Sequence, residues 1–203
     1  MGASATKEAY VICLQETWLD PADDADITSM IDGDWYYQNN SIGKGRGITT
    51  IYKSEFKLDK NITKTNYQMT KIMSESADVI NIYRSSGANT SDFLEDINAL
   101  YTRSKHTLIM GDFNICHTKE YFHEIYENLR KLGFKQLVEK PTHIEGRLID
   151  CVFIACPNNE IIYTVTQQAQ YFTDHDLIKI NKGNTYCLFM KKKNIFILLV
   201  PDE

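Results

Sequence analysis

The stretch TLIMGDFN, residues 107–114, decides how the fold is interpreted, because a strand-like run in it ends in polar groups. Thr107–Met110 suit a buried strand, Gly111 allows a tight turn, and Asp112 and Asn114 follow two positions apart. A carboxylate and a carboxamide are costly in an apolar core without partners, and a surface loop does not need the apolar run before them. The stretch therefore predicts functional groups held where a core strand ends.

Three further apolar runs end in the same way. Strand ends on one face of a sheet converge, so such groups gather at one rim, and several carboxylates repel one another unless a cation is present. Oxygen ligands of this type suit Mg2+, Mn2+ or Ca2+ rather than zinc. Taken singly, each acid also fits a solvated turn, and the histidine fits an acidic loop. The runs are ICLQETW with Glu16, RLIDCVF with Asp150, and FTDHDLI with Asp174 and His175.

Strand patterns outnumber helical ones along the chain, and neighbouring strands often follow each other without a helix. This order favours an α+β fold of layered mixed or antiparallel sheets over a doubly wound parallel sheet. Strand patterns occupy residues 10–16, 35–52, 67–73, 78–84, 107–110, 147–155, 160–166 and 175–180, and helical spacing occupies 90–104 and 120–133.

Size and charge limit the classes of protein that fit. The 203 residues suffice for one sizeable domain with a normal core. A net charge of −5 argues against a protein that holds nucleic acid mainly by bulk electrostatics. It permits a nuclease, whose cleft needs acids for a metal and only a local basic rim. Gly43–Gly47 and Arg130–Lys135 are the candidate rims, with solvated turns as the ordinary alternative.

The sequence predicts an intracellular protein, in the nucleus or the cytoplasm. No window holds the roughly 18 apolar residues that a membrane span needs, and the start lacks the apolar core of a signal peptide. Five cysteines, odd in number and irregularly spaced, predict reduced thiols. We therefore expect no membrane partner, and the sequence indicates no obligate protein partner.

The ordered motifs LQETW, NIYR, GDFN, THIEGRLIDCVFI and TDHDLI resemble the endonuclease/exonuclease/phosphatase superfamily. They are most similar to the apurinic/apyrimidinic-type endonuclease domain of non-LTR retrotransposons, and the resemblance runs in order from Tyr10 to Ile180. It implies a four-layered α/β sandwich, like that of deoxyribonuclease I, in which helices flank two mixed sheets. It also implies an enzyme that uses Mg2+ or Mn2+ to nick a DNA substrate.

The same resemblance assigns roles residue by residue. Asp112 would handle the proton of the water or of the leaving group, and Asn114 would orient the substrate. A divalent ion would stabilise the charge that gathers during phosphodiester cleavage, and protonated His175, held by Asp150, would donate to a phosphate oxygen. The implied catalytic residues are Tyr83, Asp112, Asn114, Asp150 and His175, the metal ligands are Glu16 and Asp174, and the substrate-binding residues are Arg84 and Thr142.

Two departures from the family pattern concern the ends of the chain. The family begins with a central strand that bears an asparagine, whereas only fifteen residues precede Glu16 here and none is asparagine. The sequence therefore predicts that the first strand is missing, with an N-terminally incomplete domain at 1–180 and an atypical tail at 181–203. The tail would add an edge strand or come from altered splicing or read-through. Loss of a central strand would expose its hydrogen-bonding groups.

Two other functions stay open at this level. The missing strand fits a catalytically inactive retroelement remnant, which would act at most as a binding module. The same fold could also act on a phospholipid or an inositol phosphate. The contexts PTHIEGRLID and TDHD are more similar to the nucleic-acid branch.

Overall fold

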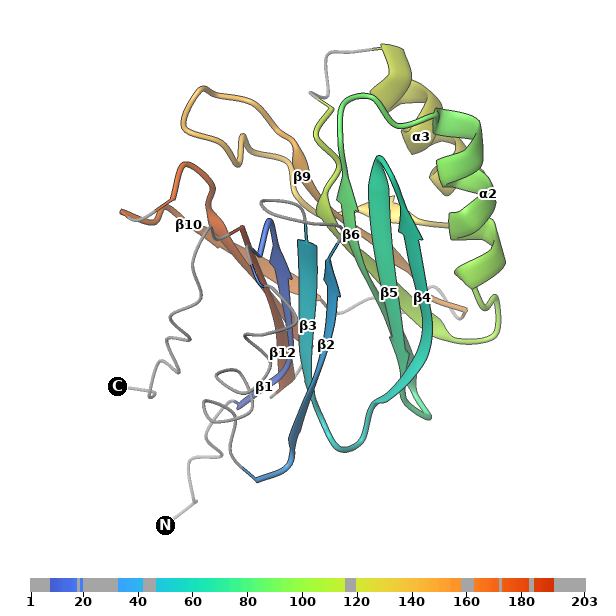
Figure 1. Cartoon of the computed structure of the whole chain (residues 1–203), viewed down its shortest axis with the longest axis vertical. Helices are drawn as coiled ribbons and strands as arrows, with labels where there is room; N and C mark the ends of the chain where they lie inside the picture. Colours follow the sequence, from blue (N-terminus) through green and yellow to red (C-terminus); the bar gives the residue numbers. More distant parts are fainter. Residues whose placement is uncertain are drawn as a thin grey trace.

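Two six-stranded sheets pack face to face in the computed structural model, and two helices cover one outer face (Figure 1). The structure describes residues 8–17, 19, 33–41, 47–115, 120–157, 163–171, 173–182 and 185–191. Sheet A contains, in spatial order, β10 (Thr164–Gln168), β11 (Leu177–Lys182), β12 (Thr185–Lys191), β1 (Glu8–Gln15), β3 (Gly47–Lys53) and β2 (Trp35–Ser41). Sheet B contains β4 (Lys57–Lys64), β5 (Tyr67–Met73), β6 (Ala77–Arg84), β7 (His106–Asp112), β9 (Asp150–Ala155) and β8 (Lys135–Gln136).

Both sheets are mixed, as predicted. β1 pairs with β12 in parallel and β6 pairs with β7 in parallel, whereas the other pairings are antiparallel. The helices α2 (Thr90–Leu100) and α3 (Glu120–Lys131) pack on sheet B. The α+β sandwich is therefore confirmed, and within the described residues it has three layers, because no described helix lies on the outer face of sheet A.

Alternation along each strand of sheet B separates two cores. Leu108 and Met110 of β7 belong to the cluster between the sheets, together with Val11 of β1. Ile109 belongs to the cluster under the helices, together with Phe153 of β9. Because successive side chains point to opposite faces, Asp112 shares the inter-sheet face with Met110. The alternation thus directs the last polar residue of β7 toward sheet A.

The C-terminal strand corrects the expectation of an added edge strand. β12 lies inside sheet A, antiparallel to β11 on one side and parallel to β1 on the other. β1 therefore has a neighbour on both edges, and its backbone groups are paired despite the predicted loss of a strand. The boundary expected at residue 180 falls inside β11, and the stretch 192–203, with IFILLV, lies outside the described residues.

The helix ends follow from local signals. The Asn89 side chain caps α2 by accepting a hydrogen bond from Asp92 N at 3.1 Å, as first-turn capping residues do. The helix ends at Leu100, four residues before the expected end at residue 104. Gly133 follows α3 with φ 92°, the left-handed conformation that glycine favours after a helix, as its place in the sequence predicts.

A buried lysine joins three strands of sheet B. Lys71 Nζ lies 2.9 Å from Asp59 Oδ2 and 3.0 Å from Asp78 Oδ2, and Lys105 Nζ lies 3.6 Å from Asp78 Oδ1. Burial lowers the pKa of Lys71, hydrogen bonds to Asp59 and Asp78 raise it, and the net pKa lies above the ordinary 10.5. Its contribution to stability is therefore present below pH 10.5 and is lost as the pH rises through the folded-state pKa.

Lys71→Met is expected to lower the free energy of unfolding by about 3 kcal/mol, because Asp78 loses its nearest cation while it stays buried. Urea denaturation at neutral pH measures the change. Lys64→Met is the matched control, since its 3.8 Å contact with Asp96 is exposed and worth less than about 1 kcal/mol. Equal losses for the two variants would contradict the assigned role of Lys71.

Two remaining expectations concern membranes and thiols. Within the described ranges, no helix is long and apolar enough to cross a membrane. Among the described residues, Cys13, Cys151 and Cys156 form no disulfide, and burial raises the pKa of the Cys151 thiol. Cys116 lies outside the described residues, as does the side chain of Cys187. The intracellular location stays a prediction.

Candidate active site

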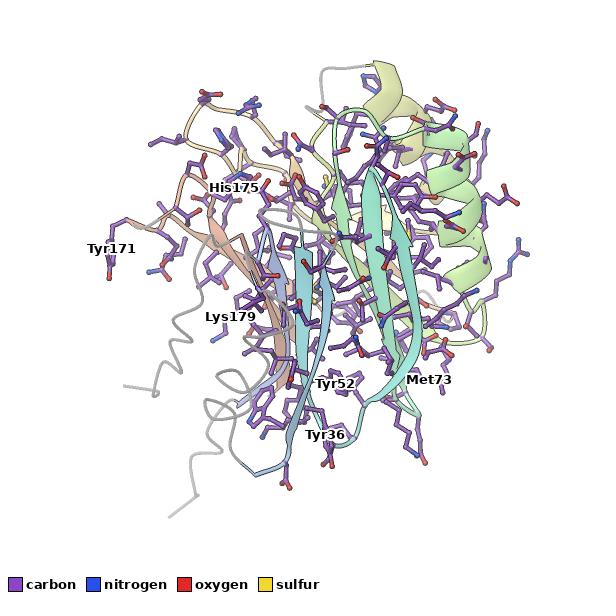
Figure 2. All side chains as sticks on the ribbon, viewed as in Figure 1. Tyr36, Tyr52, Met73, Tyr171, His175 and Lys179 are labelled. Atoms are coloured by element: carbon purple, nitrogen blue, oxygen red, sulfur yellow. The ribbon has the colours of Figure 1, made fainter. Side chains whose placement is uncertain are left out.

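Three polar residues stand side by side where neighbouring strands of sheet B begin or end. Tyr83 of β6 pairs with Asp112 of β7, and Asp112 pairs with Asp150 of β9. All three are buried, and alternation turns them toward sheet A. Figure 2 shows His175 near this end of the molecule, with Met73 at the opposite end. The predicted gathering of polar strand ends thus occurs at one rim of the sandwich.

Asp150 and His175 form a buried hydrogen-bonded pair at this rim. His175 Nδ1 lies 2.7 Å from Asp150 Oδ2, and their side chains are 1% and 0% exposed. A histidine that donates from Nδ1 to a carboxylate presents Nε2 on its other side. Asp150 Oδ1 is buried and has no hydrogen-bond partner among the described residues. The pair therefore offers an imidazole nitrogen and an unsatisfied carboxylate oxygen to the site.

Asp112 lies against this pair. Ligand atoms of Asp112, Asp150 and His175 all lie within 4.8 Å of one another. Asp112 Oδ1 accepts a hydrogen bond from Asn114 N at 2.8 Å, which helps to fix the turn after β7. Asn114 has φ 51°, an unusual value for a residue with a side chain. The turn thus carries Asn114 to the rim beside the buried carboxylates.

Glu16 approaches the rim from sheet A. It directly follows β1 and also has a positive φ, of 49°. Tyr83 OH donates to Glu16 Oε1 at 3.3 Å, so this contact joins the two sheets. Positive φ at a non-glycine residue is costly and is concentrated at functional sites. Two of the predicted site residues, Glu16 and Asn114, share this feature.

A buried polar network lies beneath Glu16 and Tyr83. Gln15 Nε2 donates to Asn81 Oδ1 across the interface between the sheets. Asn81 Nδ2 donates to Thr49 O at 3.2 Å and to Thr50 Oγ1 at 3.0 Å. These four residues are fully buried. A buried hydrogen-bond network of this kind fixes the position of one sheet relative to the other. The network therefore sets the separation between Glu16 and the strand ends of sheet B.

Thr142 ties the start of β9 to the loop that carries His175. Thr142 Oγ1 accepts from Asp150 N at 3.1 Å and from Ile149 N at 3.3 Å. Thr142 O accepts from Asp176 N at 2.8 Å. The residue thus holds the backbone on both sides of the Asp150–His175 pair.

The family model for the endonuclease/exonuclease/phosphatase family matches residues 4–175. The chain belongs to this family. No curated protein matches the sequence. The agreement between the motif order and the geometry of the rim fits this membership.

Several solved structures share the fold of this chain at low sequence identity. A 3′ phosphatase from Neisseria, bound to a product DNA hairpin, has a TM-score of 0.63 and 16% identity, with 84% of this chain and 88% of that chain covered. An AP endonuclease from Archaeoglobus fulgidus has a TM-score of 0.60 and 16% identity, with 85% and 88% covered. A 3′–5′ exonuclease from Neisseria meningitidis has a TM-score of 0.58 and 15% identity, with 84% and 88% covered.

The donors at the rim fit the divalent ion that the family typically uses. Asp112 and Asp150 bring buried carboxylates close together, and the unpartnered Asp150 Oδ1 lacks the hydrogen bond that a buried polar atom normally makes. A hard cation would satisfy that oxygen and offset the repulsion between the carboxylates. The residues present are therefore suited to a divalent cation.

The two residues expected to bind substrate need a correction. Arg84 follows Tyr83 in β6, so it points to the opposite face of sheet B, toward the Phe93 ring of α2. Its guanidinium donates to Ala88 O at 2.7 Å, and burial lowers its pKa. Thr142 is fully buried, and its hydroxyl is used by Ile149 and Asp150. Both side chains are thus used in contacts within the protein, which differs from the expected contact with a substrate.

The candidate basic rims lie at different distances from the site. Lys135 pairs with Ile154, four residues along β9 from Asp150, which is about 13 Å at the usual strand rise. The segment Arg130–Lys135 is therefore removed from the rim. Gly47 O accepts from Thr17 N at 3.1 Å, directly beside Glu16. The other residues of the segment Gly43–Gly47 lie outside the described ranges.

One residue at this rim was missed by the sequence analysis. His143 Nε2 lies 3.2 Å from Asp174 Oδ2, and its ring packs edge-on against His175 with centroids 4.8 Å apart. The motif PTH contains His143, but nothing local predicts its pairing with a carboxylate so far along the chain. A histidine next to the threonine that holds Asp150 is the only signal that the sequence offers.

The positive φ at Asn114 predicts different effects for two small substitutions. Asn114→Ala is expected to be less stable than Asn114→Gly by about 1 kcal/mol, because only glycine adopts this conformation without a steric penalty. Both variants lose the side-chain amide, so the difference between them reports the backbone conformation alone. Thermal unfolding measures this difference. An alanine variant as stable as the glycine variant would contradict strain at this position.

Proposed function

We propose that this chain is a metal-dependent phosphodiesterase that nicks DNA, of the apurinic/apyrimidinic endonuclease type found in non-LTR retrotransposons. The observation that carries the proposal is the buried Asp150–His175 pair set against Asp112. An acid–histidine pair beside a second carboxylate supplies both a proton donor and a proton acceptor to one small volume. Phosphodiester cleavage needs both, because water must lose a proton while charge gathers on the phosphate.

Each residue at the rim has one proposed task. Asp112 accepts the proton of the attacking water or returns one to the leaving oxygen. His175 donates from Nε2 to a phosphate oxygen, with Nδ1 held by Asp150. Asn114 donates a hydrogen bond to the substrate without adding charge, which a carboxylate there cannot do. Tyr83 lies beside the scissile phosphate and holds Glu16.

Mg2+ or Mn2+ is the proposed cofactor, with Glu16 and Asp174 as ligands and with the buried carboxylates nearby. When bound, such an ion stabilises negative charge on phosphoryl oxygens and acidifies a bound water. Glu16 and Asp174 offer carboxylate oxygens from two segments next to strands of sheet A, one directly after β1 and one in the loop before β11. Their exposure, partial for Glu16 and high for Asp174, keeps both within reach of a solvated ion.

DNA is the proposed substrate for two reasons. The motifs around Thr142 and Asp174 resemble the nucleic-acid branch of the family, and one structural neighbour holds a DNA hairpin. A net charge of −5 means that the contact with DNA depends on the metal and on local basic groups. The retrotransposon-type assignment rests on the ordered motif set.

A substrate panel tests this proposal. The purified chain is given supercoiled plasmid, vesicles that contain a phosphoinositide, and a soluble inositol phosphate, each with Mg2+ or Mn2+. We expect plasmid nicking without release of inorganic phosphate, and no reaction with the other two substrates. Release of phosphate from the inositol compounds, with intact plasmid, would assign the chain to the lipid and inositol branch instead.

Metal binding separates an active site from an inactive remnant. Thermal unfolding with and without Mg2+ should show a clear rise in midpoint, because a ligand that binds only the folded state stabilises it. Asp150→Asn removes the negative charge of the carboxylate whose Oδ1 has no hydrogen-bond partner among the described residues. We expect this variant to show a smaller rise in the unfolding midpoint with Mg2+. An unfolding midpoint that neither Mg2+ nor Mn2+ changes, together with plasmid that stays intact, would favour the alternative that the chain is a catalytically inactive binding module.

A further inference from the structure

The side chains gathered at the rim are mostly acidic, which opposes the approach of a nucleic acid. Glu16, Asp112, Asp150 and Asp174 bring carboxylates to it, and the whole chain has a net charge of −5. Such a surface repels DNA phosphates unless a cation lies between the two. A fixed positive group at the rim would therefore favour the bound state.

Three described cations that lie near site residues in the sequence or in a strand are used or placed elsewhere. Arg84 points to the opposite face of sheet B, toward α2. Arg147 Nη2 lies 2.7 Å from Glu145 Oε2, so Glu145 offsets its charge. Lys135 lies about 13 Å along β9 from the rim. The sequence has a further basic run, the three lysines at 191–193, of which Lys191 lies within the described residues.

The topology of sheet A brings Lys191 to the rim. Lys191 is the last residue of β12, and in the parallel register of β12 with β1 it pairs with Gln15. Gln15 directly precedes Glu16. Because neighbouring strands lie about 4.8 Å apart, the backbone of Lys191 is one strand away from the segment that carries Glu16.

The other edge of β12 leads to the segment that carries the histidine. Phe189 of β12 pairs with Ile178 of β11 in an antiparallel register. Two further steps along each strand bring Lys191 level with Asp176, the residue after His175. The end of β12 therefore lies between the two segments of sheet A that contribute to the site.

Contacts between the sheets show what the end of β12 faces. Tyr83 of β6 contacts Glu16 after β1, and Asp150 of β9 contacts His175 before β11. β7 lies between β6 and β9, just as β12 lies between β1 and β11, and residues of β7 and β12 approach each other. The carboxyl end of β12 thus faces the carboxyl end of β7, where Asp112 lies.

We propose that Lys191 binds a phosphate of the DNA backbone at this rim. The inference rests on the proposed phosphodiesterase function and names a contact that the substrate would make. Pairing of β12 on both edges fixes the backbone of Lys191, so its positive charge enters the rim at a defined position among the carboxylates. An ammonium group binds phosphate as a point charge, and each such contact with duplex DNA releases about one counterion.

The salt dependence of DNA binding tests this contact. Fluorescence anisotropy with a labelled duplex, in a chelator and at several salt concentrations, gives the slope of log Kd against log salt. We expect Lys191→Gln to weaken binding to duplexes of any sequence and to reduce the slope by about one. Lys191→Gln protein with the wild-type slope would overturn the proposal. If this variant does not fold, Lys191→Met carries the same prediction.

Two further variants separate a local contact from bulk charge and from a change in the strand. Lys57→Gln removes the same charge from an exposed position that pairs with Met73, at the end of the molecule opposite His175 (Figure 2). It should keep the wild-type slope, and so should Lys191→Arg, which preserves the cation. An equal reduction in Lys57→Gln or in Lys191→Arg would overturn the proposal.

Binding and nicking keep this inference separate from the proposed function. Wild-type protein that shows these slopes but leaves plasmid intact would refute the nuclease and support the assignment of Lys191. Nicking by the wild type, with a slope that Lys191→Gln does not change, would refute the assignment alone. Wild-type protein that binds phosphoinositide vesicles and no duplex would overturn DNA as the partner of Lys191.

Discussion

Asp112→Asn is expected to slow plasmid nicking by about 10²- to 10⁴-fold, the range for loss of a positioned general acid or base. Asp112 is fully buried between Tyr83 and Asp150 in sheet B, so no neighbouring water can replace it. Asparagine keeps the size of the side chain and an oxygen that accepts from Asn114 N. The variant therefore removes the charge and the proton acceptor while it preserves the turn.

Single-turnover nicking with excess enzyme measures this effect without product release. Asp92→Asn is the matched control, because Asp92 is exposed in the first turn of α2 and should leave the rate unchanged. Asp112→Asn within about threefold of the wild-type rate would contradict a catalytic role for Asp112, since loss of an acid or base costs far more. Circular dichroism should show the same fold for both variants.

Gly111→Ala is expected to cost more than about 4 kcal/mol of folding free energy, or to prevent folding altogether. A Cβ at Gly111 would lie 1.9 Å from Ile82 O and 2.7 Å from Ile82 C, both of which are backbone atoms. Neither can move without separating β6 from β7, which pair in parallel at this position. The methyl group would also displace Asp112, the next residue.

Urea denaturation measures the loss, and Gly87→Ala is the matched control. A Cβ at Gly87 has no heavy atom within 4 Å, so its effect should stay within about 0.5 kcal/mol. Soluble Gly111→Ala protein with the stability of Gly87→Ala would show that the two strands do not approach as closely as the structure has them.

Local patterns predicted two strand ends of the site correctly, because Glu16 directly follows β1 and Asp112 ends β7. The third differs from the expectation, since Asp150 begins β9 and does not end an apolar strand. The face of each side chain was less well predicted. Tyr83 and Arg84 are consecutive in a strand and point to opposite faces, so only one of them can serve the rim.

Strand partners depend on distant residues and were harder to predict. β4 has a mostly exposed burial pattern with Ile62 as its one buried residue, so its sequence lacks the alternation that marks a strand. β12 reads as a continuous β-like run, but nothing in the sequence specifies that it joins β1 in parallel. His143 was missed for the same reason, because its contacts with Asp174 and His175 exist only where two loops meet.

Nicking of supercoiled plasmid by the wild-type chain tests the central claim most directly. With Mg2+ or Mn2+, nicked circles should accumulate before linear DNA, and a chelator should abolish them. Asp112→Asn, prepared identically, should leave the plasmid supercoiled over the same period. Plasmid that stays intact with both metals, in a sample that is folded by circular dichroism, would contradict the assignment of this rim as a metal-dependent nuclease site.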